Sequence, residues 1–143
     1  MIFRNCHVLF ARNWPLGVHV SDGGTIGPVL FDGITIRYPR SAIVPHMGRQ
    51  SVRIDIVKDV WAKDDRRGRI NKITFRNVAM TGENIPPIMI HGHDDEHCVS
   101  DVTFAGLKVN GSEVAAPDNP IFKCNRFVRN LKVLPLTGQG TGR

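Results

Sequence analysis

The chain has 143 residues, of which 41% are hydrophobic and 22% are charged. This length fits one domain with a buried core, and this composition excludes an intrinsically disordered chain. The formal net charge of +6 favours an anionic partner, and no apolar run approaches the ~20 residues that a membrane-spanning helix needs.

One sequence unit recurs along the chain, with the pattern apolar, any, Phe, any, Asn or Gly, apolar, any, apolar. Its phenylalanine stands at Phe3, Phe31, Phe75 and Phe104, and a fifth copy has Val128 in that place. The copies are regularly spaced except for one long insertion after the second. A fixed unit with loops of variable length is typical of proteins built from stacked repeats.

Each unit predicts two short strands that meet at a bend. Ile73 and Phe75 are two positions apart and so face one side of a strand, but the step from Phe75 to Val78 is three. Asn and Gly tolerate the left-handed backbone conformation that this change of phase requires. The asparagines at the bends are expected to stack as a ladder. We place the bends at Asn5, Gly33, Asn77, Gly106 and Asn130.

A third strand follows each of the first four units after a loop of variable length. These strands are expected at residues 18–20, 52–56, 88–90 and 121–124. The two-residue hairpin signal Asn-Gly occurs only at Asn110-Gly111, which argues against a sandwich or barrel built from hairpins. The sequence therefore predicts an all-β fold, a single-stranded parallel β-helix (β-solenoid) of about four to five coils.

We expect one domain over residues 1–136, with a long charged loop at 57–70 in the second coil and a flexible C-terminal tail at 137–143. The N-terminus lacks the layout of a signal peptide. The three cysteines have neither disulfide nor zinc-knuckle spacing, and we interpret them as buried free thiols.

Residues 29–133 resemble the late coils of polygalacturonase-like proteins, of the glycoside hydrolase family 28 type, and the resemblance is specific over residues 70–114. The resemblance rests on the first strand pair at 73–78, Thr-Gly-Glu-Asn-Ile-Pro-Pro at 81–87 and His-Gly-His-Asp-Asp-Glu-His at 91–97. It implies a right-handed parallel β-helix, a carbohydrate-active ancestry and pectin-like polyuronides as ligands. It also implies secretion or export to the periplasm, where members of the family are typically found.

The catalytic signature of that family is absent from the chain. It has no Asn-Thr-Asp and no Gly-His-Gly, and Arg53-Ile54-Asp55 has an acid where the family motif needs a base. Asp94-Asp95 is an aspartate pair, but it follows the loop of a late coil. We therefore expect a truncated polygalacturonase-like protein that is inactive or limited to binding glycans. Candidate glycan-binding residues are Arg49, Arg53, Trp61, Arg66 and Arg67.

Residues 91–97 form the densest cluster of polar side chains and leave two alternatives open. As a rebuilt enzyme site, Asp94, Asp95 or His97 would be the catalytic residue, and His91, His93 and His97 would bind a metal such as Zn²⁺. As a corner loop, the same side chains would bond the backbone of a turn. A third reading of the chain is an assembly module that forms homo-oligomers through open coil ends. We expect no cofactor and neither a membrane nor a nucleic acid as partner.

Overall fold

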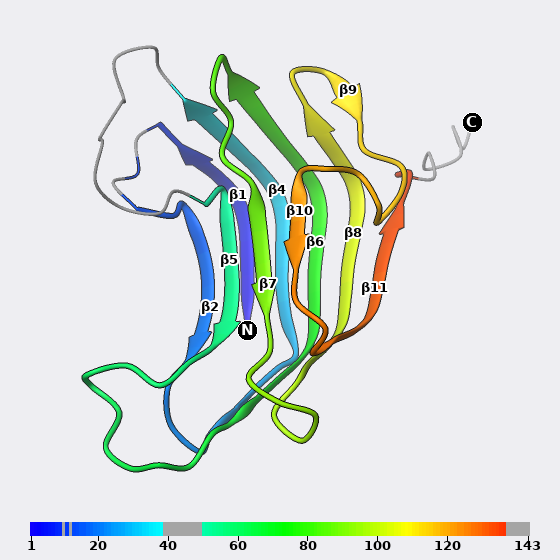
Figure 1. The fold of residues 1–143 in the computed structure, drawn as a ribbon. Helices are drawn as coiled ribbons and strands as arrows, with labels where there is room; N and C mark the ends of the chain where they lie inside the picture. The colour runs from blue at the N-terminus through cyan, green and yellow to red at the C-terminus, as the bar shows by residue number, and fades with distance from the viewer. Residues whose placement is uncertain (10, 12, 39–49, 137–143) are drawn as a thin grey trace.

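The computed structural model describes residues 1–9, 11, 13–38 and 50–136, and its regular elements are β-strands (Figure 1). In chain order they are β1 (Ile2–Val8), β2 (Leu16–Val20), β3 (Thr25–Ile26), β4 (Val29–Tyr38), β5 (Val52–Ile56), β6 (Arg69–Gly82), β7 (Ile88–His91), β8 (Val99–Val109), β9 (Ser112–Glu113), β10 (Phe122–Cys124) and β11 (Val128–Leu134). None of the described segments is a helix of the length and hydropathy that crossing a membrane requires.

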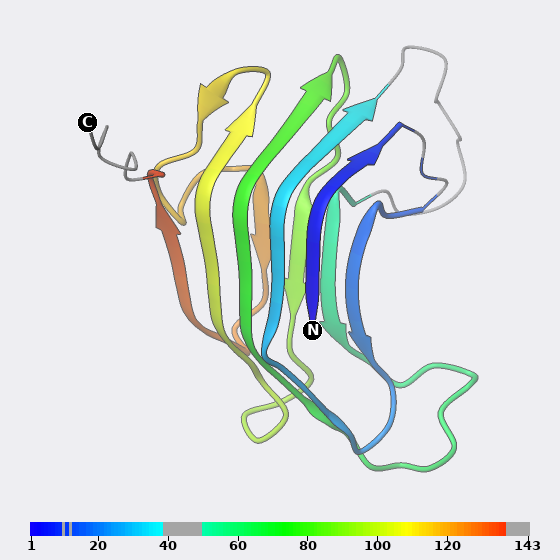
Figure 2. The same ribbon diagram turned by 180° about the vertical axis from the view of Figure 1, so that it is seen from behind.

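The strands form two sheets that face one another as two layers (Figures 1 and 2). The seven-stranded sheet has the order β1-β4-β6-β8-β11, with β3 also pairing with β6 and β9 with β8. The four-stranded sheet has the order β10-β7-β5-β2 and is parallel throughout. The four strands expected at 18–20, 52–56, 88–90 and 121–124 are confirmed as this second sheet.

The apolar core lies between the two layers. On β2 and β5 every second residue is apolar and buried, so one face of the four-stranded sheet points inward. The inner face of the seven-stranded sheet supplies the largest buried rings, Phe75 and Phe104. Burial of these two facing surfaces is the main force that holds the layers together.

The phenylalanines of the repeat form a continuous column across the seven-stranded sheet. Phe3, Phe31, Phe75 and Phe104 occupy the same position on four neighbouring strands. Their ring centres are 5.0, 4.8 and 4.6 Å apart, and neighbouring rings are tilted by 10° or less. These separations match the distance between paired strands, so in-register pairing and ring stacking stabilise each other.

Positive φ angles confirm a backbone bend at all five predicted positions, but the five bends do not lie at one level of the sheet. Asn5, Gly33, Asn77 and Gly106 all have positive φ, from 53° to 71°, and lie at one level of the sheet. Asn130 also has a positive φ of 55° but lies at a second level. At that level, Lys72, Asp101 and Asn130 occupy equivalent positions on the neighbouring strands β6, β8 and β11, and all three have positive φ. The Nδ2 atom of Asn130 donates to Asp101 Oδ1 at 2.5 Å. The prediction that Asn130 stacks in one ladder with Asn5 and Asn77 is therefore wrong.

The register of the fifth unit also differs from the prediction. Val133, and not Val128, pairs with Phe104, while Val128 pairs with Val99. The spacing contained this signal, because Val133 follows Phe104 by the same 29 residues that separate Phe104 from Phe75. The prediction placed Asn130 at the level of Asn77 because asparagine tolerates the positive φ that the bends at both levels of the sheet require.

The predicted β-solenoid is wrong, although the fold is all-β. Neither sheet curls into a solenoid, and the right-handed single-stranded parallel β-helix of four to five coils is replaced by two sheets, one mixed and one parallel. The Asn110-Gly111 turn, with both φ angles positive, folds β9 antiparallel onto β8. The repeat specifies which face of each strand is buried and where the backbone bends. Whether the strands close into coils depends on the loops that connect them, and these loops differ in length.

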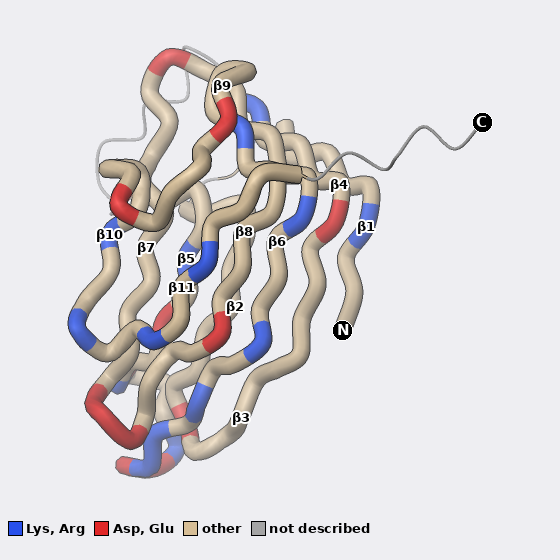
Figure 3. The backbone as a smooth tube through the Cα atoms, turned by 90° about the vertical axis from the view of Figure 1, so that its right-hand side faces the viewer, with Lys and Arg blue, Asp and Glu red and all other residues tan. Residues whose placement is uncertain are grey.

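Two further expectations concern the loops and the cysteines. The long charged loop spans 57–68, because β6 already begins at Arg69, and the tail predicted at 137–143 lies outside the described residues. Figure 3 shows that charged residues of both signs gather at the end of the molecule where the 57–68 and 92–98 loops lie. Cys6, Cys98 and Cys124 are free thiols, but none is fully buried.

The phenylalanine column makes a prediction about stability. Phe75→Ala should lower the free energy of unfolding by about 3–5 kcal/mol, because it opens a cavity in a closely packed core. Phe3→Ala should cost clearly less, since that ring is 41% exposed and has one stacking neighbour. Urea denaturation followed by circular dichroism compares the two variants. Equal losses would show that the column does not contribute as a buried stack.

Candidate functional site

The outer face of the four-stranded sheet carries polar side chains on β2 and β5. Apolar residues on both strands point into the core, so the alternating residues His19, Arg53 and Asp55 point to the other face. The parallel register places His19 directly beside Asp55. Strand pairing therefore joins two ionisable residues that are 36 positions apart in the sequence.

Asp55 is the centre of this group, and its side chain is buried beneath its neighbours. Arg53 donates two hydrogen bonds to Oδ2 of Asp55, from Nε at 2.8 Å and from Nη2 at 2.6 Å. The other carboxylate oxygen, Oδ1, lies 2.8 Å from Nδ1 of His19. Asp55 thus fixes the orientation of both partners, and they in turn satisfy a carboxylate that burial would otherwise penalise.

His19 connects the sheet to the loop that follows β5. Its Nε2 atom lies 3.1 Å from Oδ2 of Asp59 in that loop. Burial of the ring works to lower the pKa of His19, but the hydrogen bonds to Asp55 and Asp59 outweigh this effect and raise the pKa above its ordinary value. His19 is therefore protonated to a greater extent at neutral pH than an exposed histidine is.

Two tryptophans stand beside these charged residues. The Trp14 ring lies against Gly17, where a Cβ atom would come within 2.6 Å of the indole nitrogen, so glycine leaves room for the ring. The Arg53 guanidinium lies 4.4 Å from the centre of the Trp14 ring, in a cation–π contact. Trp61 belongs to the 57–68 loop, and 83% of its surface is exposed.

These side chains surround a surface groove of about 790 Å³. Asp59 shapes its rim, because Asp59 Oδ1 accepts a hydrogen bond of 2.7 Å from the backbone N–H of Trp61. That bond, together with the His19 contact, lowers the pKa of Asp59 below its ordinary value. The groove is lined by Trp14, His19, Arg53, Val57, Lys58, Asp59, Val60 and Trp61.

The groove brings together two of the five residues that the sequence analysis assigns to glycan binding. Arg53 forms its floor and Trp61 lies on its rim, although they belong to a strand and to a loop respectively. Arg49 lies outside the described residues.

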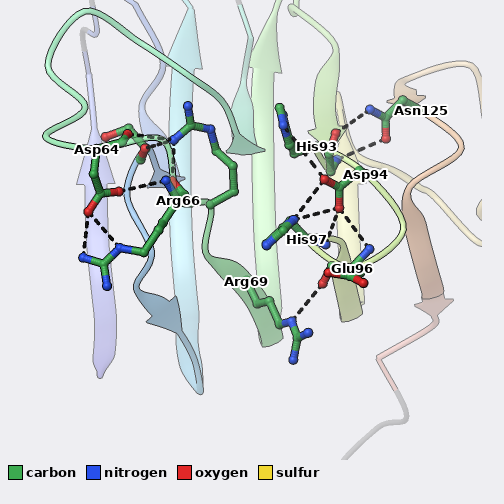
Figure 4. Close-up of polar contacts among 11 residues, drawn as sticks. Asp64, Arg66, Arg69, His93, Asp94, Glu96, His97 and Asn125 are labelled. Carbon is green, nitrogen blue, oxygen red and sulfur yellow. Dashed lines mark hydrogen bonds and ion pairs between the residues drawn. The ribbon is translucent and has the colours of Figure 1, made fainter.

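The remaining two arginines, Arg66 and Arg67, shape the loop and do not line the groove. Arg66 donates to Oδ2 of Asp64, from Nε at 2.8 Å and from Nη2 at 2.6 Å (Figure 4). Arg67 is buried, and its Nη1 atom donates to the backbone carbonyl of Ser21 at 3.0 Å. Both side chains therefore have structural partners within the protein.

The 91–97 loop is folded around the carboxylate of Asp94 (Figure 4). Oδ1 of Asp94 accepts hydrogen bonds from the backbone N–H groups of Glu96 at 2.9 Å and His97 at 2.7 Å, and it lies 2.8 Å from His97 Nδ1. Asp95 lies apart from this group, with its Oδ1 3.4 Å from Nη2 of Arg129. These contacts account for Asp94 and His97 as residues that stabilise a turn.

The three candidate metal ligands do not form a set. His93 and His97 have ring centres 6.3 Å apart, while His91 lies on β7 beside Asp55 of β5. Across the part of the chain that the structure describes, no three His, Cys, Asp or Glu side chains are arranged to hold a metal ion. The arrangement therefore gives no support to metal chemistry in this loop.

Sequence reasoning missed three residues of the group around this groove, namely His19, Asp55 and Asp59. A usable signal was present for two of them. Aligning the third strands by their buried residues gives Val18-His19-Val20 and Ile54-Asp55-Ile56, which places His19 beside Asp55. Asp59 and Trp14 belong to loops, and their approach to the strand residues depends on how those loops fold.

No known family model, curated protein or solved structure matches this chain. The similarity to polygalacturonase-like proteins therefore stays a prediction from the motifs at 81–87 and 91–97.

The turn at Asp94 makes a prediction about pH. The bond from the His97 side chain, followed by the His97 backbone N–H, lowers the pKa of Asp94. A carboxylate with a lowered pKa stabilises the folded loop above its unfolded pKa, and this stabilisation is lost as the pH falls through the folded value. Asp94→Asn should therefore destabilise the loop at neutral pH but not in strong acid. NMR monitoring of the Glu96 and His97 amides would measure this, and an equal effect at all pH values would contradict it.

Proposed function

We propose that the groove on the four-stranded sheet binds an acidic oligosaccharide of the uronate type. The observation that carries this proposal is that Trp14 and Trp61 line one groove together with Arg53. The polar and aromatic content of the groove suits a sugar, which has both apolar C–H faces and hydroxyl groups.

Aromatic rings offer flat apolar surfaces against which the C–H face of a sugar ring packs. Trp61 is available for this contact because it is largely exposed, whereas Trp14 is partly covered by Arg53. Rings of this kind lose little conformational entropy on binding, since a tryptophan has only two side-chain torsions. The two tryptophans thus supply contact area without selecting a charge.

The cationic side chains select for a carboxylated ligand. Arg53 directs two of its five N–H donors at Asp55 and remains 24% exposed, so the donors that Asp55 does not use can meet a ligand carboxylate. Lys58 lies on the same groove and contacts Asp65, a pair that is exposed and therefore weak. The net charge of +6 adds long-range attraction for a polyanion. The resemblance of the segments at 81–87 and 91–97 to polygalacturonase-like proteins implies the same ligand class.

We propose binding in preference to hydrolysis of the glycan. Hydrolysis of a glycosidic bond uses two carboxyl groups on opposite sides of the bond. Asp59 is the single acidic residue among those that line the groove, and Asp55 is buried under Arg53 and His19. This arrangement supports a protein that binds a glycan without cleaving it.

Titration of the protein with oligogalacturonate in a calorimeter tests this function. Trp61→Ala should weaken binding by about fivefold or more, because loss of an aromatic contact costs ~1 kcal/mol, and it should leave folding intact since the ring is exposed. Lys108→Ala removes one positive charge from β8, outside the groove, and serves as the matched control. Added salt should weaken binding of the wild type, because part of the attraction is between charges.

A neutral oligosaccharide of equal length should bind more weakly than oligogalacturonate if Arg53 and Lys58 select the carboxylate. Equal binding of the two sugars would remove the acidic specificity. Wild-type affinity in the Trp61→Ala variant would place the ligand elsewhere on the protein.

Self-association is a second candidate function, and one observation favours it. The edge strand β1 pairs with β4 on one side and with no described strand on the other. Ile2 is 62% exposed and Phe3 41% exposed on this strand, so an apolar surface accompanies the unpaired backbone groups. Open strand edges of this kind readily pair with another chain. We propose that a second copy of the protein docks here.

The edge makes a prediction about oligomeric state. Phe3→Lys should reduce the mass measured by light scattering toward that of a monomer, because a charged residue at the edge opposes strand addition. Val60→Lys, which also replaces an exposed apolar residue but in the 57–68 loop, should not change the mass. A monomeric wild type, or an equal effect of both variants, would count against docking at β1.

A further inference from the structure

Both ring nitrogens of His19 face carboxylate oxygens. Nδ1 lies 2.8 Å from Asp55 Oδ1 and Nε2 lies 3.1 Å from Asp59 Oδ2. An ionised carboxylate only accepts hydrogen bonds, and a neutral imidazole has a single N–H. The two contacts are therefore satisfied together only when His19 is an imidazolium.

Each of the two carboxylates belongs to a different part of the protein. Asp55 is on β5, is buried and is held by Arg53 through two hydrogen bonds. Asp59 is in the 57–68 loop, and its second oxygen accepts the backbone N–H of Trp61. The ring of His19 thus bridges the rigid sheet and the segment of loop that places Trp61 on the rim of the groove.

We propose that His19 is a proton-operated latch that holds the Trp61 segment of the loop over the groove. The charged groups that face the ring are Asp55, Asp59 and Arg53, and the two carboxylates outweigh the one guanidinium. With His19 protonated, the loop is tied to β2 at Asp59. When His19 is neutral, only one of its two ring nitrogens carries a proton, so it can no longer donate a hydrogen bond to both carboxylates. The hydrogen bond to Asp59, which holds the loop to β2, is then lost.

A direct catalytic role for His19 fits this geometry less well. A histidine that acts as general acid or base needs one ring nitrogen directed at the substrate while the other is oriented by a partner. Here Asp59 occupies the nitrogen that a substrate would use. The position of Asp59 between His19 and the Trp61 backbone is that of a structural tie.

The latch makes the groove sensitive to pH, and this consequence rests on the proposed glycan-binding function. Because the pKa of His19 is raised in the folded protein, the stabilisation is complete below the ordinary histidine pKa and is lost as the pH rises through the raised value. Uronate carboxylates are ionised throughout that range. Affinity for an acidic oligosaccharide should therefore be highest at mildly acidic pH and should fall on the alkaline side.

The first experiment uses the protein without any ligand. NMR titration of the His19 ring and of the Trp61 indole N–H, from about pH 5 to about pH 9, should show both signals changing with one midpoint above the ordinary histidine value. Asp59→Asn is the matched variant, because its amide both donates and accepts and so bonds a neutral ring as well as a charged one. In that variant the Trp61 signal should no longer follow His19. A titration midpoint of His19 at or below the ordinary histidine pKa would overturn the latch. A wild-type Trp61 signal that does not change with the protonation of His19 would overturn it as well.

The second experiment measures oligogalacturonate affinity over the same pH range. Wild-type affinity should fall about threefold or more across the His19 midpoint, and the slope should be lost in Asp59→Asn and in His19→Gln. Binding that is independent of pH in the wild type would refute the latch while supporting the proposed function. Coupled titration of His19 and Trp61 without binding at any pH would refute the proposed function and leave the latch standing.

Discussion

The in-register pairing of strands that carry the same short pattern is the constraint on which the molecule depends. Phe31, Phe75 and Phe104 stack face to face because their strands pair without slippage. A shift by one residue would turn each ring to the solvent, since strand side chains alternate between faces. Burial of the column therefore fixes the register, and the register fixes where every other residue of the sheets lies.

The same constraint creates the groove. Once the inward residues of β2 and β5 are aligned, the outward residues His19 and Asp55 must be neighbours. Asp55 is then a buried carboxylate whose partners come from its own strand and from β2, which explains why a conformational role suits it better than contact with a ligand. The groove is thus a strand-built floor of charged groups with a loop-built rim that carries Trp61.

The two loops at this end of the molecule illustrate different uses of an aspartate. Asp94 closes a local turn, with partners no more than three residues away, and such contacts are accessible to sequence reasoning. Asp59 joins its own turn to His19, which is 40 residues earlier, and this contact exists only after β2 and β5 have paired. The first arrangement stabilises a loop, whereas the second couples a loop to the sheet.

The sequence by itself determined the strands of the repeat, the face of each that is buried and the bends at Asn5, Gly33, Asn77, Gly106 and Asn130. These follow from local periodicity and from the backbone conformations that Asn and Gly tolerate. The tertiary structure decided that the chain forms two sheets and no solenoid, that Val133 takes the fifth place, and that Arg53, His19 and Asp59 meet around one groove. The physical reason is that these outcomes depend on the lengths and folds of the connecting loops, which carry no repeated pattern for local sequence rules to detect.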